Sequence, residues 1–98
     1  MYFAIIYKTG PEWLPNTPLF EQSRTALRAL TGHRNCLTAL QSSGKLVLGG
    51  PYADGAGGMA LVDVDSEEEA ASILAGDPAI VSGVFTGELH RWVQEFAR

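Results

Sequence analysis

His33 is the residue of this sequence best placed to do chemistry, because it interrupts an apolar stripe. At spacings of three and four residues, which share one face of a helix, it is accompanied by Leu30, Leu37 and Leu40. An imidazole can act as a general base near neutral pH when one ring nitrogen is oriented and the other faces a substrate. The alternative is a core histidine whose ring is hydrogen-bonded to a backbone carbonyl.

Asp77 is the carboxylate best placed to orient such a ring. It stands between the end of one predicted helix at Gly76 and a short helical turn that begins at Pro78, on the side of the sheet where the helices pack. An aspartate before a proline is also an ordinary helix N-cap, whose side chain accepts a backbone hydrogen bond. The residues alone leave both roles open.

Three further features give weaker signals. Cys36 follows His33 by three residues, and a Cys–His pair can activate a thiolate, although a small core cysteine is the commoner case. His90 could join His33 and Asp77 as the ligands of a metal ion, but the spacing of these residues does not support such a site. We expect His90 at a surface position on a strand. The glycine-rich run 54–58 lacks the helix and Lys-Ser/Thr pair of a phosphate loop. We therefore expect no metal and no cofactor.

The pattern of apolar residues and breakers predicts the elements that position these side chains. Strands are predicted at 2–7, 45–48, 59–64 and from 84 onward, helices over 18–43 and 66–76, a helical turn over 77–82, and a proline-rich loop over 10–18. Gly32 is expected to kink or restart the first helix, and Gly44 to cap its end. Ser66 and Glu69 form a capping box for the second helix.

The order β-α-β-β-α-β is the split βαβ arrangement of ferredoxin-like folds in the α+β class, with two helices on one face of a four-stranded antiparallel sheet. The segment 59–64 is apolar on both faces except at Asp63, and the first strand is apolar on both faces too. In an antiparallel sheet with one face in water, apolar and polar residues should alternate along each strand. We therefore expect the helix-free face to pack against a second copy in a homodimer.

Length and composition exclude several classes of protein. Residues 1–98 make one domain, and 46% hydrophobic with 18% charged residues indicates a folded chain. The net charge of -4 and the scattered basic residues argue against a nucleic-acid partner. A single cysteine favours a reducing cytoplasm, and no stretch approaches the roughly 18 apolar residues of a membrane span, so we expect neither a membrane protein nor a secreted one.

A set of short motifs runs through nearly the whole chain. They are His33 with Leu37, the run GKLVLGGPY at 44–52, Asp54 with Gly57-Gly58, Glu68-Glu69-Ala70, Asp77-Pro78-Ala79, Gly83-Val84-Phe85 with Glu88, and Trp92. Together they resemble the YciI-like (YCII-related domain) family, and Pro11-x-Trp13 with Glu21-Gln22 looks like one bacterial branch of it. The proline-rich loop and Gly32 depart from the better-studied branch, which leaves the substrate pocket undetermined.

The resemblance implies a dimeric α+β barrel in which His33 and Asp77 form an active-site dyad in a cleft. Most members of the family have no established reaction. A related protein of chloroaromatic breakdown is a dehydrochlorinase that uses such a dyad without a cofactor. The resemblance therefore favours acid–base chemistry on a small organic molecule.

Two functions of different classes follow. In the first, Asp77 orients His33, which moves a proton on a small aromatic or oxygenated substrate in a pocket walled by Trp13 and Tyr52. In the second, the protein is a non-catalytic dimer that binds a metabolite in the same cleft or uses the pair only for core hydrogen bonds. The enzyme predicts a cleft at His33 that is open to solvent, whereas the structural dimer predicts that both side chains are sealed.

Overall fold

The structure is a computed structural model that describes all 98 residues. Its elements are β1 (Tyr2–Thr9), the 3-10 helix η1 (Leu19–Glu21), α1 (Arg24–Ser42), β2 (Leu46–Pro51), β3 (Gly57–Asp63), α2 (Glu67–Ala75), α3 (Pro78–Val81) and β4 (Phe85–Trp92). This order confirms the predicted ferredoxin-like α+β fold. None of the helices is both long enough and apolar enough to span a membrane.

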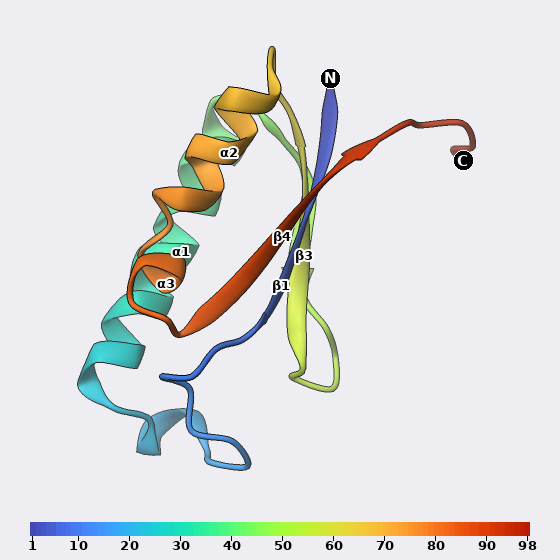
Figure 1. The fold of residues 1–98 in the computed structure, drawn as a ribbon. Helices are drawn as coiled ribbons and strands as arrows, with labels where there is room; N and C mark the ends of the chain where they lie inside the picture. The colour runs from blue at the N-terminus through green and yellow to red at the C-terminus, as the bar shows by residue number, and fades with distance from the viewer.

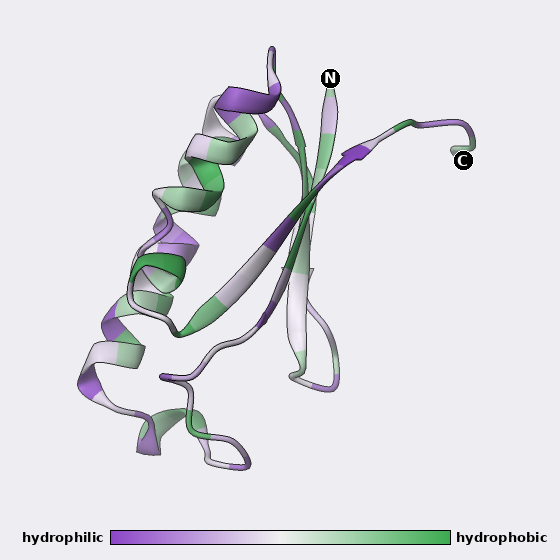
Figure 2. Ribbon diagram, in the orientation of Figure 1, coloured by the Kyte–Doolittle hydropathy of each residue, from purple (hydrophilic) through white to green (hydrophobic).

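The four strands form one antiparallel sheet in the order β2-β3-β1-β4, so the two most apolar strands are central. All the helices cover one face of this sheet (Figure 1). Hydrophobic residues are concentrated along the middle of the strands, whereas α1 and α2 alternate hydrophilic and hydrophobic turns (Figure 2). The core between the two layers is built on Phe3, Ile5, Ala60 and Val62, each at most 2% exposed.

The strand bounds differ from the sequence prediction in the β2–β3 hairpin and at the end of β4, which stops at Trp92 instead of continuing to Phe96. β2 runs on to Pro51, because it is an edge strand, where a proline removes no hydrogen bond from a neighbour. β3 begins at Gly57 rather than at Met59. A Cβ at Gly57 would lie 2.1 Å from the carbonyl oxygen of Tyr7, so only glycine lets the hairpin approach β1 this closely.

Helix α1 is continuous, and the predicted kink at Gly32 is wrong. Ser23 caps its start by accepting a hydrogen bond from the backbone N–H of Ala26, and Gly44, with φ of 78°, follows its end as predicted. A Cβ at Gly32 would lie 2.7 Å from Cγ and 2.9 Å from Cβ of Pro78. The glycine therefore serves the close approach of α1 to α3 rather than a break in the helix.

Gly32→Ala should destabilise the protein although alanine favours helix. Overpacking costs about 1–3 kcal/mol, which exceeds the roughly 0.5–1 kcal/mol that alanine gains over glycine inside a helix. Urea denaturation should show a lower free energy of unfolding for this variant. Asn35→Ala on the same helix is the control. Because Asn35 is exposed, this substitution should leave the free energy of unfolding nearly unchanged. A Gly32→Ala variant as stable as the wild type would contradict the packing argument.

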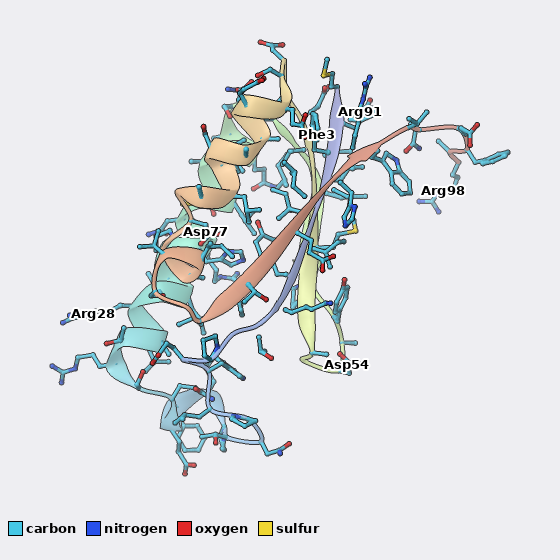
Figure 3. The ribbon with its side chains drawn as sticks, in the orientation of Figure 1. Phe3, Arg28, Asp54, Asp77, Arg91 and Arg98 are labelled. Carbon is cyan, nitrogen blue, oxygen red and sulfur yellow. The ribbon has the colours of Figure 1, made fainter.

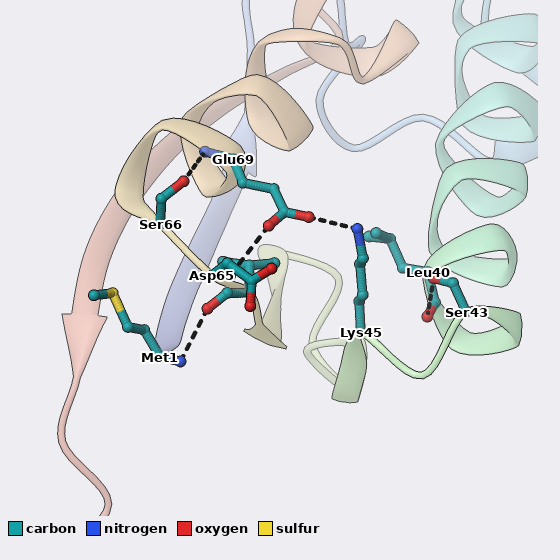
Figure 4. A network of polar contacts seen from close by, with 8 residues as sticks. Met1, Leu40, Ser43, Lys45, Asp65, Ser66 and Glu69 are labelled. Atoms are coloured by element: carbon teal, nitrogen blue, oxygen red, sulfur yellow. Dashed lines mark hydrogen bonds and ion pairs between the residues drawn. The ribbon is translucent and has the colours of Figure 1, made fainter.

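A polar network fixes the start of α2 against β2 (Figure 4). Ser66 Oγ accepts from the backbone N–H of Glu69 at 3.1 Å, as the predicted capping box requires, whereas Glu69 Oε2 accepts at 3.1 Å from the N–H of Asp65, one residue before the cap. Glu69 also forms an ion pair with Lys45. The hydrogen bond from Lys45 lowers the pKa of the Glu69 carboxyl, so the carboxylate is charged whenever the pair forms near neutral pH.

The face of the sheet opposite the helices has no cover in this chain. Residues paired across antiparallel strands point to the same face, and Ala4 pairs with Leu61, Ile6 with Met59 and Tyr2 with Trp92. Beyond β4 the tail extends away from the sheet (Figure 1) and carries Phe96, which is 90% exposed. Within one chain Ala4 and Leu61 are already only 6% and 8% exposed, whereas Leu48 and Trp92 on the same face, at 51% and 48%, and the tail are open to solvent.

Candidate active site

The structure brings His33 and Asp77 together. His33 lies in the middle of α1, and its Nδ1 is 2.5 Å from Oδ2 of Asp77, which stands at the junction of α2 and α3 (Figure 3). The side chains are 12% and 3% exposed. The carboxylate is therefore sealed beneath the imidazole, and the ring is the member of the pair that reaches toward solvent.

Asp77 performs both of the roles that the sequence left open. Its Oδ1 accepts a hydrogen bond of 2.9 Å from the backbone N–H of Ala79, which caps α3, while Oδ2 faces His33. A carboxylate that accepts at both oxygens requires a donor on the ring, so Nδ1 carries a hydrogen. Nε2 of His33 makes no hydrogen bond within the chain. It is the nitrogen left to accept a proton from another molecule.

Two aromatic rings fix the orientation of the imidazole. The centroid of the His33 ring is 4.9 Å from that of Tyr7 at an interplanar angle of 82°, and 5.2 Å from that of Phe85 at 85°. Both contacts are edge-to-face, the arrangement that aromatic quadrupoles favour. With Asp77 behind it and a ring on either side, the imidazole has little freedom to rotate.

Tyr7 is a candidate site residue that the sequence did not indicate. It is 3% exposed, yet its hydroxyl makes no hydrogen bond within the chain. Burial, with a smaller effect of the nearby Asp77 and Cys36, raises the pKa of Tyr7 well above its usual range. Tyr7 is therefore a neutral phenol that can donate a hydrogen bond beside His33.

A cavity of about 650 Å³, partly open to solvent, lies in front of these side chains. Its walls come from α1, from the glycine-rich β2–β3 hairpin and from Tyr7 and Phe85, and His33 is part of the lining. On the helix side of the sheet, Tyr7 is paired with Gly58, which also lines the cavity, and with Gly87, where Leu74 and Ile80 fill the space that a side chain would occupy. The volume is within the range of small-molecule sites.

The structure does not place Trp13 and Tyr52 in the lining of this cavity. Trp13 packs against the alanines of α1 and α3 and against Val84, since the proline-rich loop folds over that end of the helix layer. Tyr52 begins the β2–β3 turn, where its N–H donates to the carbonyl of Gly57, and its side chain is 42% exposed. The aromatic wall at the cavity is instead made by Tyr7 and Phe85.

The weaker candidates lie apart from the cavity. Burial, with the charge of Asp77, raises the pKa of the Cys36 thiol, which opposes a thiolate, and Cys36 is not part of the lining. His90 lies on the helix-free face of the sheet, with Nε2 3.3 Å from Glu88 Oε2. His90 therefore does not join His33 and Asp77, and no three His, Cys, Asp or Glu residues are grouped as metal ligands.

Comparison with known proteins identifies a family, a relative in sequence and a structure with a similar fold. The model of the YCII-related domain matches residues 1–93. The uncharacterized protein YjpA of Bacillus subtilis (strain 168) is 36% identical over 76 residues, which cover 78% of this chain and 84% of YjpA. The structure of 5-chloro-2-hydroxyhydroquinone dehydrochlorinase (TftG) from Burkholderia phenoliruptrix AC1100, in complex with 2,5-dihydroxybenzoquinone, is similar with a TM-score of 0.65 and 21% identity.

The similarity to TftG covers 97% of this chain and 96% of that one, and at this identity it establishes the shared fold. The family match covers nearly the whole sequence, and YjpA supports it at the level of sequence identity. This chain belongs to the YCII-related domain family.

Proposed function

We propose that this protein is an enzyme that transfers a proton on a small organic molecule, with His33 as the general base. The observation that carries the proposal is the placement of the imidazole between a sealed carboxylate and a cavity. Nδ1 is engaged by Asp77 at 2.5 Å, and His33 lines the cavity with Nε2 free of intramolecular hydrogen bonds. This is the arrangement that a base with a fixed tautomer requires.

The chemistry follows from His33 and Tyr7, which line the cavity, and from Asp77, which lies behind the imidazole. Nε2 of His33 removes a proton from an acidic O–H or C–H of the substrate, and the Asp77 carboxylate stabilises the imidazolium that results. The electron pair moves to a substrate oxygen, to which the neutral Tyr7 hydroxyl donates a hydrogen bond. In an isomerisation the imidazolium returns the proton to another atom, and in a dehydrochlorination chloride leaves with the electrons of the C–Cl bond.

The similarity to TftG suggests where to look for a substrate. That protein is named as a dehydrochlorinase of a chlorinated hydroxyhydroquinone, and its structure contains 2,5-dihydroxybenzoquinone. Removal of HCl begins with loss of a proton, which a single positioned base can perform. Hydroxylated six-membered rings are therefore the first class of compound to test.

The test of this proposal compares the wild type with His33→Asn, whose amide can still donate toward Asp77 but cannot take up a proton. Chloride release from 5-chloro-2-hydroxyhydroquinone and deuterium uptake from D2O into hydroxylated quinones and ketones would be followed. We expect the variant to be slower by about 10²–10⁴-fold. The matched control is His90→Asn, which should keep the wild-type rate.

A wild-type protein that binds these compounds without accelerating either reaction would contradict the enzymatic proposal. It would favour the alternative, a non-catalytic protein that binds a small metabolite in the same cavity. Equal rates for the wild type and His33→Asn would remove His33 from the role of base.

We further propose that a second copy of the chain covers the helix-free face of the sheet. Only 16 of the 98 residues are buried within one chain, although nearly half of the residues are hydrophobic. The apolar centre of the face is bordered by residues of both signs, with Lys8 3.7 Å from Glu88 and Asp63 at the other end of the sheet. A surface of this kind is complementary to itself about a two-fold axis.

Leu48→Glu should produce a monomer that is still folded, because Leu48 pairs with Leu61 on the helix-free face and is 51% exposed within one chain. Trp92→Glu, at the exposed end of β4, should do the same. Light scattering measures the mass of the assembly, and circular dichroism reports the fold. The control is Val81→Glu, a 74% exposed residue on α3, which should leave the dimer intact. A wild-type monomer at micromolar concentration would contradict the proposal.

A further inference from the structure

The lining of the cavity differs in charge from the rest of the protein. The chain has 11 Asp and Glu against 7 Lys and Arg, yet no Asp or Glu is among the 18 residues that line the cavity. The nearest carboxylate that the site uses, Asp77, is sealed behind the imidazole with 3% of its side chain exposed. A negatively charged ligand in this cavity therefore faces no exposed carboxylate in the lining.

Arg34 is the one Lys or Arg in the lining. It follows His33 on α1 and forms no ion pair, whereas Lys8 and Lys45 are engaged by Glu88 and Glu69. Arg28, six residues earlier on the same helix, points away from the sheet on its outer side (Figure 3). Arg34 is thus the unpaired cation that faces the cavity.

The threonines of α1 that line the cavity do not compete with Arg34 as donors, and Gln41, whose amide also lines it, carries no charge. Thr31 and Thr38 line the cavity, but their hydroxyls donate to the backbone carbonyls of Leu27 and Arg34, at 3.2 Å and 2.9 Å. Their oxygens remain as acceptors. The guanidinium presents several N–H groups in a plane that matches a carboxylate with two parallel hydrogen bonds.

We infer that the substrate is a small organic acid whose carboxylate binds Arg34 while its reacting atoms lie at His33 and Tyr7. The inference rests on the proposed function, because it uses the same cavity and names the class of compound that enters it. The apolar part of the acid packs on the leucines of α1 and on Phe85, which also line the cavity. The phenol of Tyr7 then meets an oxygen of the reacting part rather than the carboxylate.

A matched pair of probes tests this assignment by affinity and needs no turnover. The probes are 2,5-dihydroxybenzoate and 2,5-dihydroxybenzamide, which share a ring and differ in charge. Titration followed by ¹H–¹⁵N NMR of the full chain should show the acid binding at least tenfold more tightly than the amide, with the largest shifts at cavity residues. Added salt should weaken binding of the acid more than that of the amide.

Two variants identify the residue responsible. Arg34→Gln should weaken binding of the acid about tenfold and leave the amide unchanged, whereas Arg28→Gln should change neither. Equal affinities for the two probes, equal losses in the two variants, or no binding of the acid at millimolar concentration would each overturn the inference. The role of His33 is measured by rate in His33→Asn, so loss of the charge preference is distinguishable from loss of the catalytic role.

Discussion

Asp77→Asn should slow the His33-dependent reaction by about 10²–10⁴-fold while the protein stays folded. The asparagine Oδ1 can still accept from the N–H of Ala79, so the cap of α3 is kept. Its amide nitrogen takes the place of Oδ2 and donates to Nδ1 of His33. The ring must then carry its hydrogen on Nε2, and the nitrogen that faces the cavity can no longer accept a proton.

The tautomer of His33 is measurable without a substrate. Long-range ¹H–¹⁵N NMR distinguishes a protonated ring nitrogen from an unprotonated one, and the two nitrogens should exchange roles between the wild type and Asp77→Asn. The control is Asp54→Asn, in an exposed turn where Asp54 Oδ1 accepts from the N–H of Ala56. An unchanged tautomer together with an unchanged rate would reduce Asp77 to a helix cap.

Local chemistry explains why the order of elements could be predicted from the sequence. Helix starts depend on side chains within three or four residues, and Ser66 caps α2 through the N–H of Glu69 as predicted, although the Glu69 carboxylate returns to Asp65 rather than to Ser66. The end of α1 at Gly44 depends on the glycine itself. His33 could be found for the same reason, because its departure from the apolar stripe is visible within one helix.

Features that depend on contacts between distant segments could not be predicted in this way. Gly32 is of a residue type that often interrupts a helix, but here it allows the close contact with Pro78, 46 positions later. Tyr7 continues the apolar face of β1, so in the sequence it has the signature of a core residue. Only the fold, which places Tyr7 beside His33 and, with its neighbour Gly58, in the lining of the cavity, shows its second role.

Asp77 illustrates a different limit of reasoning from sequence. From the sequence, capping and partnership with His33 are alternative roles, although a carboxylate has two oxygens that can accept from different donors. In the structure the cap uses Oδ1 and the histidine faces Oδ2. The cap therefore fixes the direction in which the second oxygen points, and the local role makes the long-range role possible.

Asp77→Ala should accordingly be among the most destabilising single substitutions in the chain. It removes an N-cap, at a cost of about 0.5–2 kcal/mol, and a buried hydrogen bond to a charged group, at a cost of about 1.5–3 kcal/mol. We expect a total loss of about 2–5 kcal/mol in the free energy of unfolding. The control is Ser66→Ala, which removes only the cap of α2 and should cost about 1 kcal/mol.

A double-mutant cycle separates the two costs, with urea denaturation at one protein concentration throughout. In a His33→Ala background Oδ2 of Asp77 has already lost its partner, so Asp77→Ala should cost no more there than the cap alone. Asp77→Asn, which keeps the cap, should lie between the wild type and Asp77→Ala. If Asp77→Ala has the same cost with and without His33, the 2.5 Å contact contributes nothing to stability. Orienting the imidazole would then be the only role left for that contact.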